Sequence, residues 1–167
     1  MKTGFKKRKG FIMKKLILLF LFITSIFLFS EENILKGKVI KVSDGDTITV
    51  LTNDMKEYKI RLEHIDAPEK TQDFGQVAKK KLSEILWNED VKIIYKHTDR
   101  YGRIIGEIYK NNLFVNEYMI RNGYAWWYKK YSTKKYLGEL QDKAKENHKG
   151  LWATDNPINP ENYRRKK

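Results

Sequence analysis

Residues 39–62 read VIKVSDGDTITVLTNDMKEYKIRL, and apolar side chains recur at every second position in three short runs. A period of two is typical of β-strands that bury one face. The turns between the runs contain Gly, Asn and Asp, which tolerate the positive φ angles of tight hairpins. The stretch therefore predicts three antiparallel strands in a meander. The runs lie at residues 39–42, 47–50 and 57–62, with turns at 43–46 and 52–54.

A different period follows the third run. Between Phe74 and Trp87, apolar residues recur every three to four positions with lysines opposite, which predicts an amphipathic helix. Two more strands are expected at residues 91–95 and 104–109, on either side of a turn that contains Gly102. Five short strands with a helix inserted after the third predict a small closed barrel, because closure removes the exposed edges of a short sheet.

The C-terminal part carries shorter helical signals. Residues 113–122 predict one helix, and residues 132–147 predict another that Ser132 or Thr133 can cap. Residues 153–167 lack periodicity and are expected to form a basic tail that is extended or frayed. The expected fold class is α+β: a five-stranded OB-fold barrel plus three α-helices, formed by a single domain over residues 31–152.

Residues 1–30 have the composition of a targeting segment. They hold seven cations and no acid, and a predominantly apolar run follows the cations. The run is shorter than the roughly 20 residues that span a bilayer, so a signal peptide is predicted. Bulky Phe29 at the cleavage end leaves an uncleaved N-terminal anchor open, and Met13 is a second candidate start. In either case the domain is expected to be secreted or otherwise extracytoplasmic.

The composition limits the chemistry that the chain can perform. The 167 residues carry a formal net charge of +13, and 27 cations and 21 acids remain without residues 1–30. This basic balance favours polyanions or anionic membranes as partners. Because cysteine is absent, disulfide scaffolds, thiolate zinc sites and a cysteine nucleophile are all excluded.

Four acidic residues lie at the ends of the predicted strands. Asp44 and Asp46 are in the first turn, and Asp66 and Glu69 follow the third strand. In a meander both places can meet at one end of the sheet, so these carboxylates can converge. Hard oxygen donors without a histidine cluster favour Ca²⁺ or Mg²⁺ over zinc. The alternative is that each acid only shapes its turn.

Two arginines are mounted near the same acids. Arg61 lies on the polar side of the third strand, and Arg103 begins the fifth strand after a tight turn. Guanidinium groups match phosphate oxygens bidentately and remain protonated, so with a carboxylate-held cation they suit a phosphoryl group. A surface ion pair is the alternative for each arginine.

The order of these motifs resembles the staphylococcal nuclease (thermonuclease) family. DGDT at 44–47, Arg61, IDAPE at 65–69 and DRYGR at 99–103 occur in this order, and the resemblance runs from about residue 35 to 152. It implies an OB-fold barrel with three helices and a Ca²⁺-dependent phosphodiesterase that acts on DNA and RNA. Such an enzyme cleaves the bond between phosphorus and the 5′ oxygen and leaves 3′-phosphate ends.

The resemblance also implies roles for individual residues. Asp46 and Asp66 correspond to the Ca²⁺ carboxylates, with the backbone carbonyl of Ala67 as a third ligand. Glu69 corresponds to the glutamate that activates the attacking water. The two arginines that bind the scissile phosphate and stabilise its transition state are Arg61 and Arg103.

Further positions correspond to the substrate pocket. Arg100 and Tyr101 are implied to bind substrate, and Tyr131 falls where another aromatic residue lines the pocket. The chain has alanine at position 67 where the staphylococcal enzyme has threonine, and its loop at 70–74 is shorter. DNA and RNA are the expected partners, with single strands or frayed duplexes preferred. No protein partner is implied, and a monomer is expected.

Two other classes of function are compatible with part of the sequence. A non-catalytic OB module could hold single strands through aromatic and cationic side chains. A membrane-tethered adhesion or scaffold domain could use residues 1–30 as its anchor. The binding module does not require Asp46, Asp66, Glu69, Arg61 and Arg103 together, so that constellation separates a nuclease from it. The N-terminus of the mature protein tests the tethered domain, because a protein that begins at Glu31 would have lost the anchor.

Overall fold

A computed structural model describes residues 32–166 of the chain. The predicted signal peptide at 1–30 lies outside the described residues, as does Lys167. Within residues 32–166, no helix has both the length and the apolar character needed to cross a membrane.

The described chain folds into short strands and helices. The strands are β1 (Asn33–Val42), β2 (Thr47–Leu51), β3 (Glu57–Leu62), β4 (Ile65–Asp66), β5 (Asp90–Thr98), β6 (Ile104–Lys110), β7 (Leu113–Phe114) and β8 (Trp126–Trp127). The α-helices are α2 (Gly75–Leu86), α3 (Val115–Arg121), α4 (Tyr136–Glu146) and α5 (Pro160–Arg165), and 3-10 turns occupy η1 (Lys129–Tyr131) and η2 (Gly150–Ala153).

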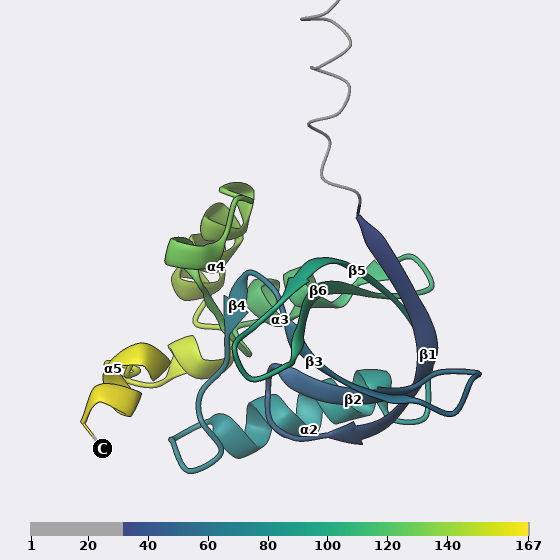
Figure 1. The fold of residues 1–167 in the computed structure, drawn as a ribbon. Helices are drawn as coiled ribbons and strands as arrows, with labels where there is room; N and C mark the ends of the chain where they lie inside the picture. Colours follow the sequence, from purple (N-terminus) through teal and green to yellow (C-terminus); the bar gives the residue numbers. More distant parts are fainter. Residues whose placement is uncertain (1–31, 167) are drawn as a thin grey trace, which may run out of the picture. The chain divides into compact units, whose positions relative to one another are not determined.

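Strands β1, β2, β3, β5 and β6 form a closed barrel, as the sequence predicts (Figure 1). The sheet runs in the order β3-β2-β1-β5-β6-β7, and a parallel pairing between β3 and β6 closes it. In this pairing Ile60 lies beside Ile104 and Leu62 beside Gly106. The α+β class and the five-stranded OB-fold barrel are therefore confirmed.

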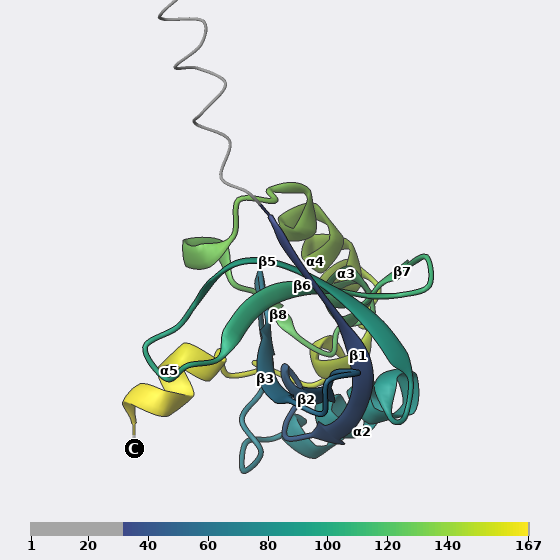
Figure 2. The ribbon, with the colours of Figure 1, turned by 45° about the vertical axis from the view of Figure 1, so that its right-hand side comes forward.

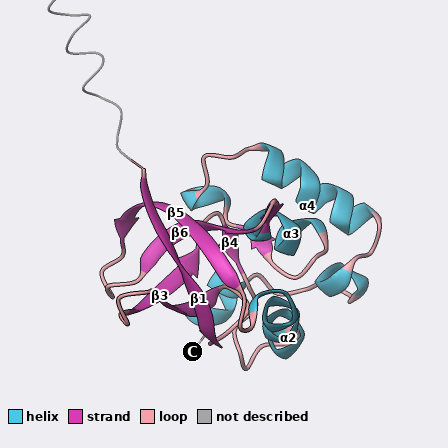
Figure 3. Ribbon diagram, turned by 90° about the vertical axis from the view of Figure 1, so that its right-hand side faces the viewer, coloured by secondary structure: helices cyan, strands magenta, loops and turns pink. Residues whose placement is uncertain are grey.

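The core fills the barrel and extends under the helices. Alternate residues of the strands, such as Ile48, Ile60 and Ile108, have no exposed surface. Helix α2 adds Leu82 and Leu86 to the same core. Figure 2 shows α2 below the barrel, and Figure 3 shows α2, α3 and α4 gathered beside the strands. This packing leaves the loops after β3 and β5 free to form a site.

Helix α2 matches its predicted bounds closely, but the later elements differ. Leu113 and Phe114 extend the sheet as β7, and the Phe114 ring stacks on Tyr109 with centroids 5.0 Å apart. Helix α4 begins at Tyr136, so the predicted cap at Ser132 or Thr133 is wrong. Instead, the Ser132 hydroxyl accepts a hydrogen bond from the backbone N–H of Lys134, which shapes the loop before the helix.

The prediction for residues 153–167 is also wrong, because residues 160–165 form helix α5. The side chain of Asn159 accepts a hydrogen bond from the Glu161 N–H at 2.9 Å, and Pro160 is the first helical residue. An asparagine cap followed by proline is a standard helix start. A helix of 6 residues is too short to show an apolar period, which is why the periodicity missed it.

Candidate active site

The pairing of β2 with β3 brings the first two predicted site residues together. Thr47 lies opposite Arg61 in this ladder, so Asp46, one residue earlier, lies beside the arginine. One guanidinium nitrogen of Arg61, Nη2, is 3.0 Å from Asp46 Oδ2 and 2.9 Å from Asp66 Oδ1. The two predicted metal carboxylates therefore converge, and Arg61 joins them.

Two hydrogen bonds hold the Asp46 carboxylate in place. The N–H of Ala67 donates to Asp46 Oδ2 at 3.1 Å, and the Thr47 hydroxyl donates to Asp46 Oδ1 at 2.9 Å. A side chain at Gly45 would place a Cβ 2.7 Å from the Ala67 Cβ, so glycine is required here for close approach. The sequence predicts that Gly, Asn or Asp supplies a positive φ in these turns, but no residue of 43–46 has a positive φ, and after the second turn Met55 has one.

Burial and charge set the protonation of these groups. Burial and the adjacent Asp46 charge raise the pKa of Asp44 to about 6. Burial also raises the pKa of Asp66, although hydrogen bonds from Arg164 oppose the rise. For Arg61, burial acts to lower the pKa, but the charges of Asp46 and Asp66 outweigh it, so the pKa lies above its ordinary value. The Asp46 and Asp66 carboxylates therefore lie around the Arg61 guanidinium, which remains charged.

Glu69 lies on a short loop between β4 and α2 whose shape is fixed by its own backbone. The Gln72 side chain accepts from the Glu69 N–H at 3.1 Å, and the Gln72 N–H donates to the Glu69 carbonyl at 2.8 Å. A Cβ at Gly75 would lie 1.9 Å from that same carbonyl oxygen. Glycine at the start of α2 thus allows the loop to fold back and present Glu69 to the site.

Arg103 is held by the turn that precedes β6. Asp99 accepts hydrogen bonds from the N–H groups of Tyr101 and Arg103 at 2.9 Å. Its other oxygen contacts Arg103 Nε and Nη2, both at 2.7 Å. Gly102 adopts a φ of 75°, which completes the turn. Arg103 therefore projects from a rigid turn, as the sequence predicts, with its charge partly offset by Asp99.

One cavity of about 810 Å³ gathers these groups. Among the predicted residues, those that line it are Asp46, Arg61, Ala67, Glu69, Arg100, Tyr101, Arg103 and Tyr131. Asp66 reaches the cavity through ion pairs with two lining residues, Arg61 and Arg164. The structure thus brings every predicted site residue to one place, although the sequence separates them by up to 85 positions between Asp46 and Tyr131.

Aromatic side chains form the rim of the cavity. Tyr101 and Tyr131 are both largely exposed, and the guanidinium of Arg100 lies 4.8 Å from the Tyr101 ring centre. Sequence analysis did not assign Tyr128, whose ring lies 5.7 Å from Arg61 and packs edge-on against Tyr131 at 4.6 Å. Tyr128 lies in a run of aromatic residues. The sequence of such a run does not distinguish a side chain that packs in the core from one that contacts a ligand.

Arg164 of α5 is the second residue that the sequence did not indicate. Its Nη2 is 2.8 Å from Asp66 Oδ2, and its Nη1 is 2.7 Å from Glu69 Oε1. It lies 98 positions from Asp66, in a segment expected to be frayed. No local pattern in the sequence could place it here.

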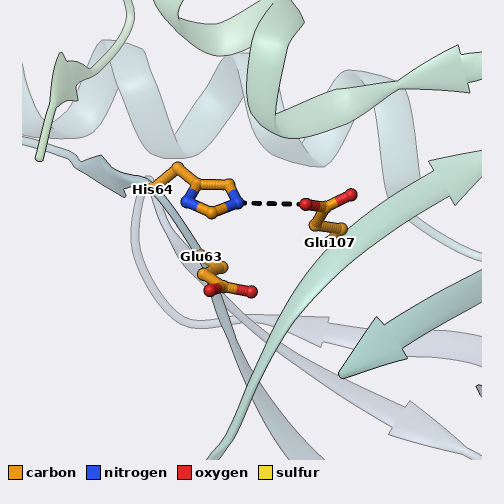
Figure 4. Close-up of side chains that lie close together, drawn as sticks. All are labelled: Glu63, His64 and Glu107. Carbon is orange, nitrogen blue, oxygen red and sulfur yellow. Dashed lines mark hydrogen bonds and ion pairs between the residues drawn. The ribbon is translucent and has the colours of Figure 1, made fainter. Parts of the chain in front are cut away.

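A second group of potential metal ligands includes two residues that line the same cavity, Glu63 and His64 (Figure 4). Glu63, His64 and Glu107 bring donor atoms within 4.8 Å of one another. His64 Nε2 is 3.0 Å from Glu107 Oε1, which also pairs with Lys134 at 3.1 Å. Burial acts to raise the pKa of Glu107, but hydrogen bonds from its neighbours lower it to about 2. Glu107 thus links His64 and Lys134 in one hydrogen-bonded and ion-paired network.

The donors around Asp46, by contrast, suit a hard cation. Asp46 and Asp66 provide carboxylate oxygens from two buried side chains, and Ala67 is the residue expected to add a carbonyl. Oxygen-only donor sets of this kind match Ca²⁺ and Mg²⁺. The residues present therefore fit the metal that the resemblance implies.

Comparison with known proteins identifies the family of the chain. The model of the staphylococcal nuclease homologue family matches residues 59–154. The chain belongs to this family. The matched residues include Arg61, Glu69 and Arg103, but the match begins after Asp46 and ends before α5.

The relatives of the chain include bacterial proteins. The chain is 44% identical to a protein of Haemophilus influenzae named "Uncharacterized endonuclease" over 77% of this chain and 72% of the relative. A protein of Escherichia coli with the same name is 39% identical over 93% of this chain and all of its own length. A protein of Shigella flexneri named "Micrococcal nuclease" is 34% identical over 78% of this chain and 80% of its own.

Proposed function

We propose that the protein is a Ca²⁺-dependent nuclease that hydrolyses phosphodiester bonds of DNA and RNA. The observation that carries the proposal is the ion-paired group of Asp46, Arg61 and Asp66, which lies at one cavity with Glu69 and Arg103. Family membership and the endonuclease and nuclease names of the relatives support it. A non-catalytic binding module would need the cationic and aromatic side chains of the cavity, but it would not need the converging carboxylates.

Different side chains of the protein have different roles in hydrolysis. Asp46 and Asp66, with the Ala67 carbonyl, would hold the ion, which when bound neutralises charge on a phosphate oxygen. Arg61 and Arg103 contact the non-bridging oxygens and stabilise the charge that these gain in the transition state. Glu69 orients the attacking water and accepts its proton at a carboxylate oxygen.

The products and the substrate form part of the same proposal. The water attacks phosphorus, the bond to the 5′ oxygen breaks, and the electron pair leaves with that oxygen, so the other fragment ends in a 3′-phosphate. Arg100, Tyr101 and Tyr131 on the rim bind the adjoining nucleotides, which favours single strands or frayed duplex ends. We propose that the protein acts as a monomer outside the cytoplasm.

Digestion assays test the function directly. The full-length protein is incubated with single-stranded DNA, duplex DNA or RNA. Three conditions are compared for each substrate: wild type with Ca²⁺, wild type with excess chelator, and the Glu69→Gln variant with Ca²⁺. We expect cleavage with Ca²⁺, none with chelator, at least a hundredfold slower cleavage by the variant, and 3′-phosphate ends. Equal cleavage in all three conditions would reject the chemistry. Binding of single strands without cleavage would favour the non-catalytic OB module instead.

A further inference from the structure

The C-terminal segment is fastened to the loop that carries Glu69. The Gln72 side chain donates to the Ile158 carbonyl at 2.6 Å, and the Tyr163 hydroxyl donates to the Thr71 carbonyl at 2.9 Å. Pro160 is buried at the start of α5. These contacts fix the helix across the edge of the cavity, where Arg164 is one of the lining residues.

Arg164 binds the two carboxylates that the proposed reaction needs. Its Nη1 and Nη2 contact Asp66 Oδ1 at 3.2 Å and Asp66 Oδ2 at 2.8 Å, so both oxygens of this carboxylate accept from one guanidinium. The same Nη1 lies 2.7 Å from Glu69 Oε1. Paired, bidentate contacts of this kind are among the stronger hydrogen-bonded ion pairs in proteins. Arg164 thus contacts both a proposed metal ligand, Asp66, and the proposed water-activating group, Glu69.

A cation bound to Asp66 and the Arg164 guanidinium compete for the same negative charge. A metal ion needs a lone pair of Asp66, and at this distance a dication and a guanidinium also repel each other. Arg61 also contacts Asp46 and Asp66, but it is held in β3 by bonds from Nη1 to the carbonyls of Leu62 and Ile65. Arg164 lies on a six-residue helix, and for that helix to move away the hydrogen bonds from Gln72 to Ile158 and from Tyr163 to Thr71 would have to break.

We infer that α5 is an autoinhibitory strap, in which Arg164 acts as an internal cation that occupies Asp66 and Glu69 until a divalent metal ion displaces it. The inference rests on the proposed function for the identity of the metal site. It adds to that proposal that metal binding and the release of α5 from the site are coupled in one equilibrium. Any ion that binds only the strap-free form then binds with an apparent affinity reduced by the fraction of molecules in that form.

A different role for Arg164 is distinguishable from this one. As a third phosphate-binding arginine that stays in place, it would strengthen substrate binding, and Ca²⁺ would leave hydrogen exchange of the α5 amides unchanged. As a strap it weakens Ca²⁺ binding, and Ca²⁺ releases α5. Arg165, the next residue, provides a matched control, since it pairs with Glu161 inside α5 and its side chain is 70% exposed.

Calorimetric titration of Ca²⁺ into the full-length protein tests the strap. We expect Arg164→Gln to bind Ca²⁺ about tenfold more tightly than wild type, and Arg165→Gln to stay within about twofold of it. Because the coupling is reciprocal, Ca²⁺ should also speed hydrogen exchange of the α5 amides in wild type. Thermal melts of each variant confirm that it is folded.

Each outcome decides for or against the strap. Unchanged or weaker Ca²⁺ binding by Arg164→Gln overturns it, as does α5 exchange that Ca²⁺ leaves the same or slows. Failure of Ca²⁺ to bind any variant at millimolar concentration also overturns it, since nothing would then displace the arginine. If Arg164→Gln binds Ca²⁺ more tightly but the wild type cleaves no nucleic acid, the strap stands and the nuclease proposal falls.

Discussion

Single residues determine how closely the reactive groups can approach. Arg61 is 14% exposed at its side chain and joins Asp46 to Asp66, so a guanidinium serves as the centre of the site. Gly75 matters in another way, because its missing Cβ leaves room for the carbonyl of Glu69. The placement of Arg61 and the lack of a side chain at Gly75 are therefore as important for the site as the charges of its groups.

Gly75→Ala tests the second of these requirements. The new Cβ would lie 1.9 Å from the Glu69 carbonyl oxygen, which is backbone and cannot turn aside. We expect the loop to shift, with a loss of about 1 to 3 kcal/mol of unfolding free energy and at least tenfold slower cleavage. Denaturant melts and initial rates measure the two effects, and Lys80→Ala on the exposed face of α2 is the control. A variant with the stability and rate of wild type would show that the loop does not need glycine.

At the scale of elements, one ion-pair network ties the barrel to the segment that leads into α4. Glu107 of β6 accepts from the Tyr109 hydroxyl at 2.9 Å and pairs with His64 and Lys134. His64 precedes β4 and has a φ of 68°. The network therefore anchors both the β3–β4 turn, which positions Asp66, and the loop before α4.

The pKa of Glu107 makes the stability of this network depend on pH. Hydrogen bonds lower the pKa to about 2, from 4.5. A depressed pKa stabilises the fold at pH values above 4.5, and this contribution is lost as the pH falls toward 2. We expect Glu107→Gln to cost about 1 to 3 kcal/mol at pH 7 and progressively less below pH 4.5. Urea melts of both proteins across that range measure the difference, and a constant difference would contradict the pKa shift.

The sequence predicts the barrel elements well and the irregular ones poorly. The strand runs of period two and helix α2 are predictable because four or more residues repeat one pattern. Strands β4 and β8 have two residues each, and their pairing of Ile65 with Trp127 depends on the tertiary fold. The convergence of Asp46 and Asp66 followed from strand order, whereas Arg164 reached the site through docking of a distant helix.

For the whole molecule, charge determines how a polyanion is captured. Residues 31–167 hold 27 cations against 21 acids, and exposed Lys129 and Lys130 directly precede Tyr131 of the aromatic rim. Phosphate contacts release counterions when nucleic acid binds, so affinity falls as salt rises. The basic surface thus acts on binding, while the cavity acts on the chemical step.

Raising NaCl from about 50 to 200 mM separates these two contributions. We expect the affinity for a single-stranded oligonucleotide to fall at least tenfold, while the single-turnover rate at saturating substrate changes less than threefold. Fluorescence anisotropy in chelator gives the affinity, and rapid-quench cleavage in Ca²⁺ gives the rate. An affinity that is independent of salt would mean that the protein makes few phosphate contacts.

The central claim is that Arg61 and Arg103 act on the same phosphodiester. It is tested most directly by the single-turnover cleavage rates of wild type, Arg61→Gln, Arg103→Gln and the double variant, at saturating oligonucleotide and Ca²⁺. The account predicts that each single change slows cleavage by about 10² to 10³, and that the double variant is far less impaired than the product of the two effects. Two effects that multiply in full, or a single variant that cleaves at the wild-type rate, would contradict it.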